Sequence, residues 1–112
     1  FDDVKDNYTI MKEEPFGPLV PILTFKTFDE VIERANDNDL GLCSYLYTNS
    51  MDKAHIGSEK LETGCVAVNT GVVALAEAPF GGIKQTGYGR EGGSGAIKDY
   101  LNVKYTHMGL KI

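Results

Sequence analysis

A chain of 112 residues, 42% hydrophobic and 24% charged, has the composition of one ordinary globular domain or of part of one. Eleven basic residues against 16 acidic ones give a net charge of −5 without a cluster of Lys or Arg, so the sequence predicts no nucleic-acid partner. No apolar run is long enough to span a membrane, and two cysteines are too few for a disulfide framework, so we expect no membrane partner and a reducing, cytoplasmic location.

The predicted elements begin with a solvated connector and a rigid turn. Residues 1–7 are acidic and polar, and residues 8–11 are compatible with a short strand. They precede Glu13-Glu14-Pro15-Phe16-Gly17-Pro18, in which two prolines and a glycine fix the backbone. A carboxylate two positions before an aromatic ring on such a turn suits a ligand clamp. The residues alone favour a simpler interpretation, in which Glu14 is a surface acid and Phe16 a core side chain.

An alternation of strands and helices follows. Residues 19–25 form an apolar run typical of a buried strand, and Pro21 places it at a sheet edge or at the strand's start. Thr27 and Glu30 form a capping box ahead of an amphipathic helix. Residues 42–48 predict a second strand. Its alternation puts Leu42, Ser44 and Leu46 on one face and Cys43, Tyr45 and Tyr47 on the other.

A second helix and a third strand complete this part of the chain. The helix is predicted to start at Asn49 or Ser50 and to end at Gly64 in the left-handed conformation. Gly57 lies inside it, where glycine lowers stability, without a local reason. Residues 65–69 are nearly all apolar and predict a central strand. This order of elements predicts an α/β fold with parallel strands and flanking helices.

Cysteine and histidine residues give no sign of a metal centre or of a catalytic thiol. Cys43 and Cys65 each lie in an apolar, strand-like segment, where a buried reduced thiol is the favoured interpretation and a nucleophile the weaker alternative. The spacing of the two cysteines, His55 and His107 matches no zinc pattern, so we predict no metal.

Two loops follow the last predicted strand. Residues 71–78 are small and apolar and lie at the carboxyl end of that strand, the edge where open α/β sheets bind ligands. Seven of the 13 glycines then fall between Gly81 and Gly95, which predicts a long structured loop with positive φ angles or close backbone contacts. Residues 87–92 satisfy G-x-G-x-x-G, but the strand and helix that a dinucleotide fingerprint needs are missing. Arg90 is interpreted as an anchor of this loop and of subunit contacts, in preference to a role in holding an anion.

The last segment is predicted to hold a short helix and a strand. Ser94 is expected to cap a helix that reaches Leu101, with Ile97, Tyr100 and Leu101 turned inward. Residues 103–108 alternate and predict an exposed strand, and an unpaired strand at a terminus invites pairing with another chain.

The glycine-rich loop also carries a family resemblance. Its sequence, Pro79-Phe80-Gly81-Gly82-Ile83-Lys84-Gln85-Thr86-Gly87-Tyr88-Gly89-Arg90-Glu91, resembles the P-F-G-G-x-K-x-S-G-x-G-R-E signature of the aldehyde dehydrogenase superfamily. Thr86 stands where Ser is usual. The segment 13–18 resembles the family's E-E-x-F-G-P element at a matching separation. The resemblance implies an α/β fragment from the C-terminal part of the catalytic domain (1–101), followed by an oligomerisation strand and tail (102–112).

The resemblance also implies roles for individual residues. Glu14 would accept hydrogen bonds from the nicotinamide ribose of NAD or NADP, and Phe16 would lie beside the nicotinamide. Val72, Ala74 and Phe80 would line the aldehyde pocket. Within the family, Asn69-Thr70-Gly71, residues 78–85 and the ending Lys104-Tyr105-x-x-Met108-Gly109-Leu110 resemble succinate-semialdehyde dehydrogenases. Ala74 stands where that group often has a serine for the substrate's carboxylate.

No catalytic residue is predicted in this chain. Neither cysteine has the family's G-Q-x-C context, and the resemblance places the general base outside the chain as well. The parent is therefore expected to be an NAD(P)-dependent aldehyde dehydrogenase, a homodimer or homotetramer joined through the C-terminal strand, and the chain alone to be inactive. The alternative is a free-standing, non-catalytic α/β module for protein interaction.

Overall fold

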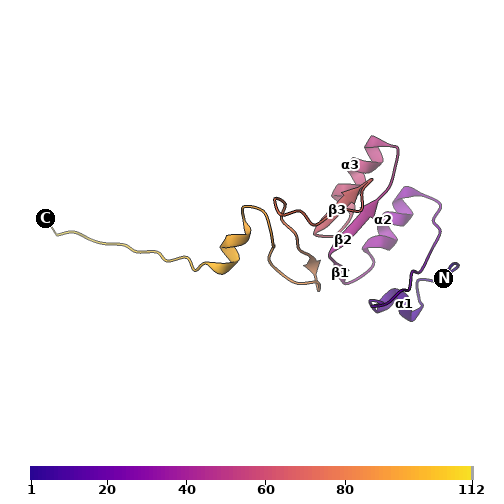
Figure 1. Ribbon diagram of the computed structural model, residues 1–112, viewed down its shortest axis with the longest axis horizontal. Helices are drawn as coiled ribbons and strands as arrows, with labels where there is room; N and C mark the ends of the chain where they lie inside the picture. Colours follow the sequence, from indigo (N-terminus) through magenta and orange to yellow (C-terminus); the bar gives the residue numbers. More distant parts are fainter. Residues whose placement is uncertain (112) are drawn as a thin grey trace.

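A computed structural model describes residues 1–111 (Figure 1). Three α-helices, four short strands and a 3₁₀ helix occur in these residues. In chain order they are α1 (Thr9–Lys12), α2 (Phe28–Asn36), β1 (Leu40–Gly41), β2 (Cys43–Leu46), α3 (Met51–Lys60), β3 (Cys65–Val68), β4 (Ile83–Lys84) and η1 (Ala96–Tyr100).

A parallel β–α–β unit forms the centre of the fold. Strands β2 and β3 pair in parallel, from Cys43 opposite Cys65 to Leu46 opposite Val68. Helix α3 joins them and packs against both strands and against α2, as Figure 1 shows. Strands β1 and β4 form a second, antiparallel pair that brings the glycine-rich loop back to the start of this unit. The predicted α/β architecture with parallel strands is therefore confirmed.

Side-chain caps start both longer helices where the sequence predicts. The Thr27 hydroxyl accepts a hydrogen bond from the Glu30 N–H at 3.2 Å, and the Ser50 hydroxyl accepts one from the Lys53 N–H at 3.3 Å. Such caps satisfy N–H groups that have no partner within a helix. The caps fix the residue at which α2 and α3 each begin.

Gly57 allows α3 to approach the sheet closely. It is buried, and a Cβ atom there would lie 2.6 Å from Cδ2 of Leu46 and 3.4 Å from Cζ of Phe28. A glycine inside a helix costs roughly 1 kcal/mol relative to alanine. The close contact of α3 with Leu46 of β2 and Phe28 of α2 therefore explains why a glycine stands at position 57.

Two predicted strands near the N-terminus are wrong. Residues 9–12 form a helical turn, and no strand is assigned to residues 19–25. A strand needs a neighbour that accepts and donates along its length. In the described part of the chain the only such partner is Phe1, whose N-terminus donates to the Val20 carbonyl and whose carbonyl accepts from the Ile22 N–H.

Three predictions at loop and helix ends also need correction. Gly64 does not have a positive φ, and α3 ends at Lys60, with the C-cap residue Leu61 in an extended conformation. Ser94 does not cap η1, because Gly95 holds the N-cap position without a side-chain hydrogen bond. Ile97 and Tyr100 do not turn inward, since they are 60% and 82% exposed.

The C-terminal tail extends away from the rest of the molecule. No strand is assigned to residues 101–111, and Figure 1 shows them running outward from η1. Val103 is fully exposed, and Tyr105 is 84% exposed. The pairing of this tail with another subunit stays a prediction, because a single chain offers it no partner strand.

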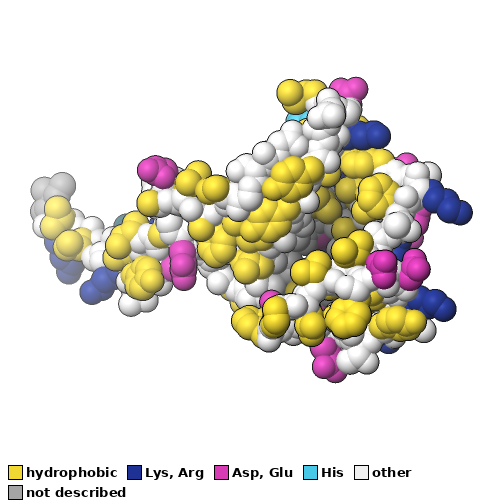
Figure 2. Space-filling model, turned by 45° about the vertical axis from the view of Figure 1, so that its right-hand side comes forward, with side chains coloured by type: hydrophobic (Ala, Val, Ile, Leu, Met, Phe, Trp, Pro, Cys, Tyr) yellow, Lys and Arg dark blue, Asp and Glu magenta, His cyan; other side chains and the backbone are white. Residues whose placement is uncertain are grey.

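Little of the chain's apolar surface is buried within the chain itself. Of the described hydrophobic side chains only Ile32 and Ala67 are buried, with 8% and 4% of their surface exposed. The accessible surface is 9473 Å², against about 6,000 Å² for a compact protein of this mass. The radius of gyration is 19.5 Å, against about 13 Å for a compact chain of this length. Figure 2 shows hydrophobic side chains across the middle of one face and along its lower edge. Such surface is typical of an interface with further protein.

Candidate functional site

A pair of hydrogen bonds fixes the carboxyl ends of the parallel strands. The Asn69 side-chain oxygen accepts from the Thr48 N–H, and its NH₂ group donates to the Thr48 carbonyl, both at 2.9 Å. Asn69 has a φ of 54°, in the left-handed region that asparagine tolerates better than most residues. The turn at Asn69 therefore directs the following loop away from a defined point on the sheet edge.

The loop of residues 70–78 carries two of the predicted pocket residues. Its backbone is held by hydrogen bonds from the Val72 N–H to the Thr70 hydroxyl and from the Ala78 N–H to the Leu75 carbonyl, both at 3.2 Å. Val72 is 58% exposed, and Ala74 is also exposed. The structure thus places Val72 and Ala74 together at the carboxyl edge of the strands, with small apolar side chains open to a ligand or to further protein.

Phe80 connects this loop to the glycine-rich segment. Its N–H donates to the Glu91 carbonyl, and the Glu91 N–H donates to the Phe80 carbonyl, both at 2.7 Å. Beside this bridge Gly92 has a φ of 64°, and a Cβ atom there would lie 2.7 Å from the Ala78 carbonyl oxygen. The bridge fixes the position of the half-buried Phe80, which precedes Gly81 near the amino ends of β2 and β3, not at the edge that carries Val72 and Ala74.

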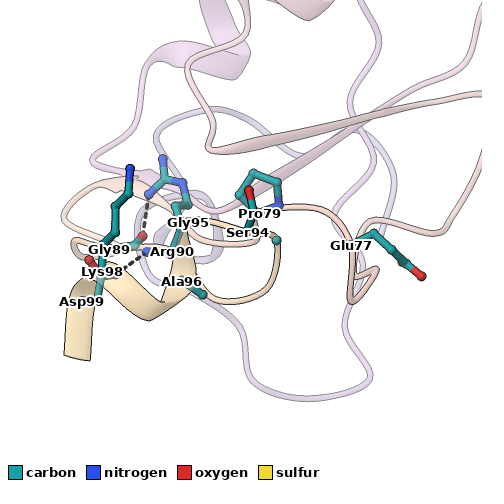
Figure 3. Close-up of a pocket in the computed structure, with 10 residues that line it drawn as sticks. Glu77, Pro79, Gly89, Arg90, Ser94, Gly95, Ala96, Lys98 and Asp99 are labelled. Atoms are coloured by element: carbon teal, nitrogen blue, oxygen red, sulfur yellow. Dashed lines mark hydrogen bonds between the residues drawn. The ribbon is translucent and has the colours of Figure 1, made fainter. Parts of the chain in front are cut away.

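Arg90 anchors the glycine-rich loop, as predicted from its sequence. One guanidinium nitrogen, Nη1, donates to the carbonyls of Gly82 at 2.8 Å and Gly89 at 2.7 Å. The Arg90 N–H donates to the Asp99 carboxylate at 3.1 Å, which ties the loop to η1. Figure 3 shows the contacts with Gly89 and Asp99. The arginine of the motif therefore shapes the backbone, and its planar set of donors suits that role.

Lys84 and Thr86 of the same motif also have structural partners. The Lys84 ammonium donates to the carbonyls of Asn36 and Asn38, both at 3.0 Å, and pairs with Glu62 at 2.6 Å. The Thr86 hydroxyl accepts from the Gly41 N–H at 2.8 Å. A serine at this position would offer the same acceptor, so the departure at Thr86 preserves the contact. The motif's polar side chains hold the loop against α2 and β1.

Two open hollows lie beside the glycine-rich loop. One, of about 500 Å³, lies between this loop and η1, and Arg90 and Lys98 are among the lining residues that Figure 3 labels. The other, of about 270 Å³, has Phe80, Tyr88 and Leu42 among its lining residues. Neither is lined by Val72 or Ala74. The sequence did not predict the first hollow. Most of its lining residues come from the glycine-rich loop and from η1, and no local sequence pattern indicates that these two segments lie close together.

Glu14 and Phe16 lie in a different part of the molecule. They follow α1, and both are exposed, Phe16 to 93%. Within residues 1–111 no hydrogen bond or ion pair joins either residue to the loops described above. The structure therefore does not bring the predicted cofactor residues together with Val72, Ala74 and Phe80.

Arg34 holds the N-terminal segment to α2. It donates to the Thr24 carbonyl and to the Asp6 carboxylate, both at 2.8 Å, and it pairs with Glu30 at 3.4 Å. The hydrogen bond with Asp6 raises the pKa of the Arg34 guanidinium, and backbone hydrogen bonding from Lys26 lowers the pKa of the Glu30 carboxyl. These contacts position the connection that carries Glu14 and Phe16.

No cluster of three metal-binding side chains occurs among the described residues. His55 lies 3.6 Å from Glu59 on the exposed side of α3, and His107 lies beside Tyr105 in the tail. Over the same residues no helix has both the length and the apolar character that crossing a bilayer requires.

Comparison with known proteins identifies a family that matches this chain. Residues 1–106 match the aldehyde dehydrogenase family. The NADP⁺-dependent succinate-semialdehyde dehydrogenase of Escherichia coli is 46% identical over 108 residues, and the glutarate-semialdehyde dehydrogenase of Pseudomonas aeruginosa is 46% identical over 107. Each alignment covers 96% of this chain and 22% of the relative.

Solved structures show the same relation. The indole-3-acetaldehyde dehydrogenase of P. syringae, in complex with NAD⁺ and IAA, superposes with a TM-score of 0.90 at 40% identity. That match covers 95% of this chain and 21% of the solved chain, so this chain spans about a fifth of the length of the proteins it matches. Because the family match extends over nearly the whole sequence, the chain belongs to the aldehyde dehydrogenase family.

Proposed function

We propose that this chain is the C-terminal part of the catalytic domain of an NAD(P)-dependent aldehyde dehydrogenase, with residues 1–101 in that domain and residues 102–112 as an oligomerisation strand and tail. The observation that carries the proposal is the family match over residues 1–106. The large exposed apolar surface supports it, because a piece of a larger fold exposes the faces that the remainder covers.

In this proposal Glu14 and Phe16 serve the cofactor. An ionised carboxylate has several acceptor sites and suits the vicinal hydroxyls of a ribose. Glu14 fits this role in that it is exposed and no described ion pair occupies it. Phe16 presents its ring to the surroundings of the chain, as a residue that positions a nicotinamide must. Bound NAD(P)⁺ would supply a hydride acceptor for aldehyde oxidation.

Val72, Ala74 and Phe80 would form one wall of the aldehyde pocket. Val72 and Ala74 lie in the loop that follows the carboxyl ends of β2 and β3, the edge where such sheets bind ligands, which supports their assignment. Phe80 adjoins Gly81 near the amino ends of these strands, so its assignment rests on the family resemblance. The names of the relatives favour succinate semialdehyde or a similar acid aldehyde as the substrate. The Ala74 methyl cannot bond the substrate's carboxylate, so other residues of the enzyme would have to hold that charge.

The proposed reaction is tested by NAD(P)H formation with succinate semialdehyde and with butanal, an uncharged aldehyde of equal chain length. The protein at its native length should reduce the cofactor with both. The Ala74→Ser variant should raise kcat/KM for succinate semialdehyde relative to butanal by roughly fivefold, the value of one added hydrogen bond of about 1 kcal/mol. Absence of aldehyde-dependent NAD(P)H from the native-length protein would overturn the proposal, and an unchanged ratio would remove Ala74 from the pocket wall.

A further inference from the structure

Cys43 and Cys65 are direct neighbours across the parallel strand pair. They are the first residues of β2 and β3 and stand opposite each other in the register. Neighbouring strands lie about 4.8 Å apart, and disulfides form between residues with Cα atoms roughly 4.4–6.8 Å apart. Paired residues on adjacent strands also direct their side chains to the same face of the sheet. The backbone therefore places both thiols on one face, within bridging distance.

Contacts around the two cysteines identify that face. The Leu46 side chain lies against α3 near Gly57, and alternation puts Cys43 on the opposite face. There the Cys65 thiol donates to the Gly81 carbonyl at 3.8 Å, so the glycine-rich loop passes over the pair. Both cysteines are free and half-buried.

The protonation of Cys43 is consistent with this proximity. Burial raises the pKa of the Cys43 thiol, and the neighbouring Cys65 raises it further through its charge and a hydrogen bond. A raised pKa lowers the thiolate fraction at neutral pH, and the thiolate is the nucleophile in thiol oxidation. Cys43 should therefore react slowly with an oxidant at neutral pH.

We propose that Cys43 and Cys65 form a cross-strand dithiol that a peroxide converts to a disulfide. One thiolate attacks a peroxide oxygen and becomes a sulfenic acid, with release of water. The second thiolate attacks the sulfenic sulfur, forms the S–S bond and expels the oxygen as a second water. Two thiols and one hydrogen peroxide thus give one disulfide and two waters. Oxidation also removes the S–H group that Cys65 donates to the Gly81 carbonyl. The disulfide would therefore form next to the loop that carries Phe80.

The test uses hydrogen peroxide on the protein at its native length, followed by alkylation of free thiols, trypsin and mass spectrometry. Cleavage after Lys and Arg leaves Cys43 in the peptide 35–53 and Cys65 in the peptide 61–84, with one cysteine in each. We expect a species that joins the two peptides, lighter than their sum by two hydrogen atoms, which dithiothreitol separates. A reaction at about pH 8.5 raises the thiolate fraction and shortens the experiment.

Two variants test whether the disulfide depends on the pairing of Cys43 with Cys65 in the sheet or forms between any two nearby thiols. Cys43→Ser should abolish the joined species. The double variant Cys43→Ser with Ser44→Cys keeps a thiol in the same strand but moves it to the opposite face, and it should also give no joined species. The proposal is overturned if the native protein oxidises at each cysteine separately, if the double variant cross-links as well as the unaltered protein, or if only the urea-unfolded protein forms the bond.

Discussion

Replacing Gly64 by alanine is expected to destabilise the region around the glycine-rich loop by about 3 kcal/mol or more, because the added methyl group has no space. A Cβ atom at Gly64 would overlap the carbonyl oxygen of Gly81 and approach Cα of Gly82 to 3.0 Å. Both obstacles are backbone atoms, which cannot rotate aside as a flexible side chain can. Gly64 is itself held, since its N–H donates to the Gly41 carbonyl at 3.0 Å. Relief therefore requires movement of β3 or of the loop.

Hydrogen exchange read by mass spectrometry measures this effect locally. In the protein at its native length, Gly64→Ala should increase exchange in peptides that cover residues 79–91 and should lower aldehyde oxidation along with it. Gly95→Ala is the matched control, because Gly95 has helical angles of −85° and −22° and no atom lies within 4 Å of the added Cβ. Equal exchange in the two variants would show that the close contact between Gly64 and Gly81 does not hold the loop.

The second large effect is expected at Glu14. Changing it to glutamine keeps the shape of the side chain and removes its charge. If Glu14 holds the nicotinamide ribose, Glu14→Gln should lower kcat/KM for NAD(P)⁺ by roughly tenfold to a hundredfold, because hydrogen bonds to charged groups contribute about 1.5–3 kcal/mol. Steady-state kinetics with varied cofactor and saturating aldehyde measures it.

Glu13 provides a close control for this variant. It is the adjacent carboxylate on the same connection, and like Glu14 it is exposed. Glu13→Gln removes the same charge from nearly the same place, so a general electrostatic effect would appear in both variants, whereas a ribose contact would appear only in Glu14→Gln. Similar kinetics for the two would refute the assignment of Glu14.

Local sequence rules predicted the parts of the fold that local interactions determine. The caps at Thr27 and Ser50 depend on contacts three residues apart, and both occur where the sequence indicates. The parallel order of β2, α3 and β3 follows from alternating hydrophobic patterns. Residues 19–25 were misassigned because an apolar run does not specify a partner strand, and the described residues supply only Phe1. The predicted burial is absent too, since Val20 is 67% exposed and Phe25 55% exposed.

Predictions that depend on distant segments succeeded less well. Gly64 was predicted to adopt a left-handed turn, but glycine is needed there because the backbone of Gly81, in another loop, leaves no space for a side chain. The proximity of Arg90 and Asp99 had no local signal either. The sequence did place the loop with Val72 and Ala74 after the carboxyl ends of the parallel strands, whereas Phe80 lies near their amino ends. The sequence did not indicate that Glu14 and Phe16 lie apart from the predicted pocket residues. The family resemblance describes the complete enzyme with its cofactor bound, and this chain is only one part of it.

The intact mass of the protein as its own cells produce it tests the central claim most directly. Because the matched relatives are about five times longer than this chain, the account predicts a mass several times 12.2 kDa. That longer protein should form NAD(P)H from an aldehyde, and the 112-residue chain by itself should not. A native mass near 12 kDa would contradict the account and favour a free-standing, non-catalytic interaction module.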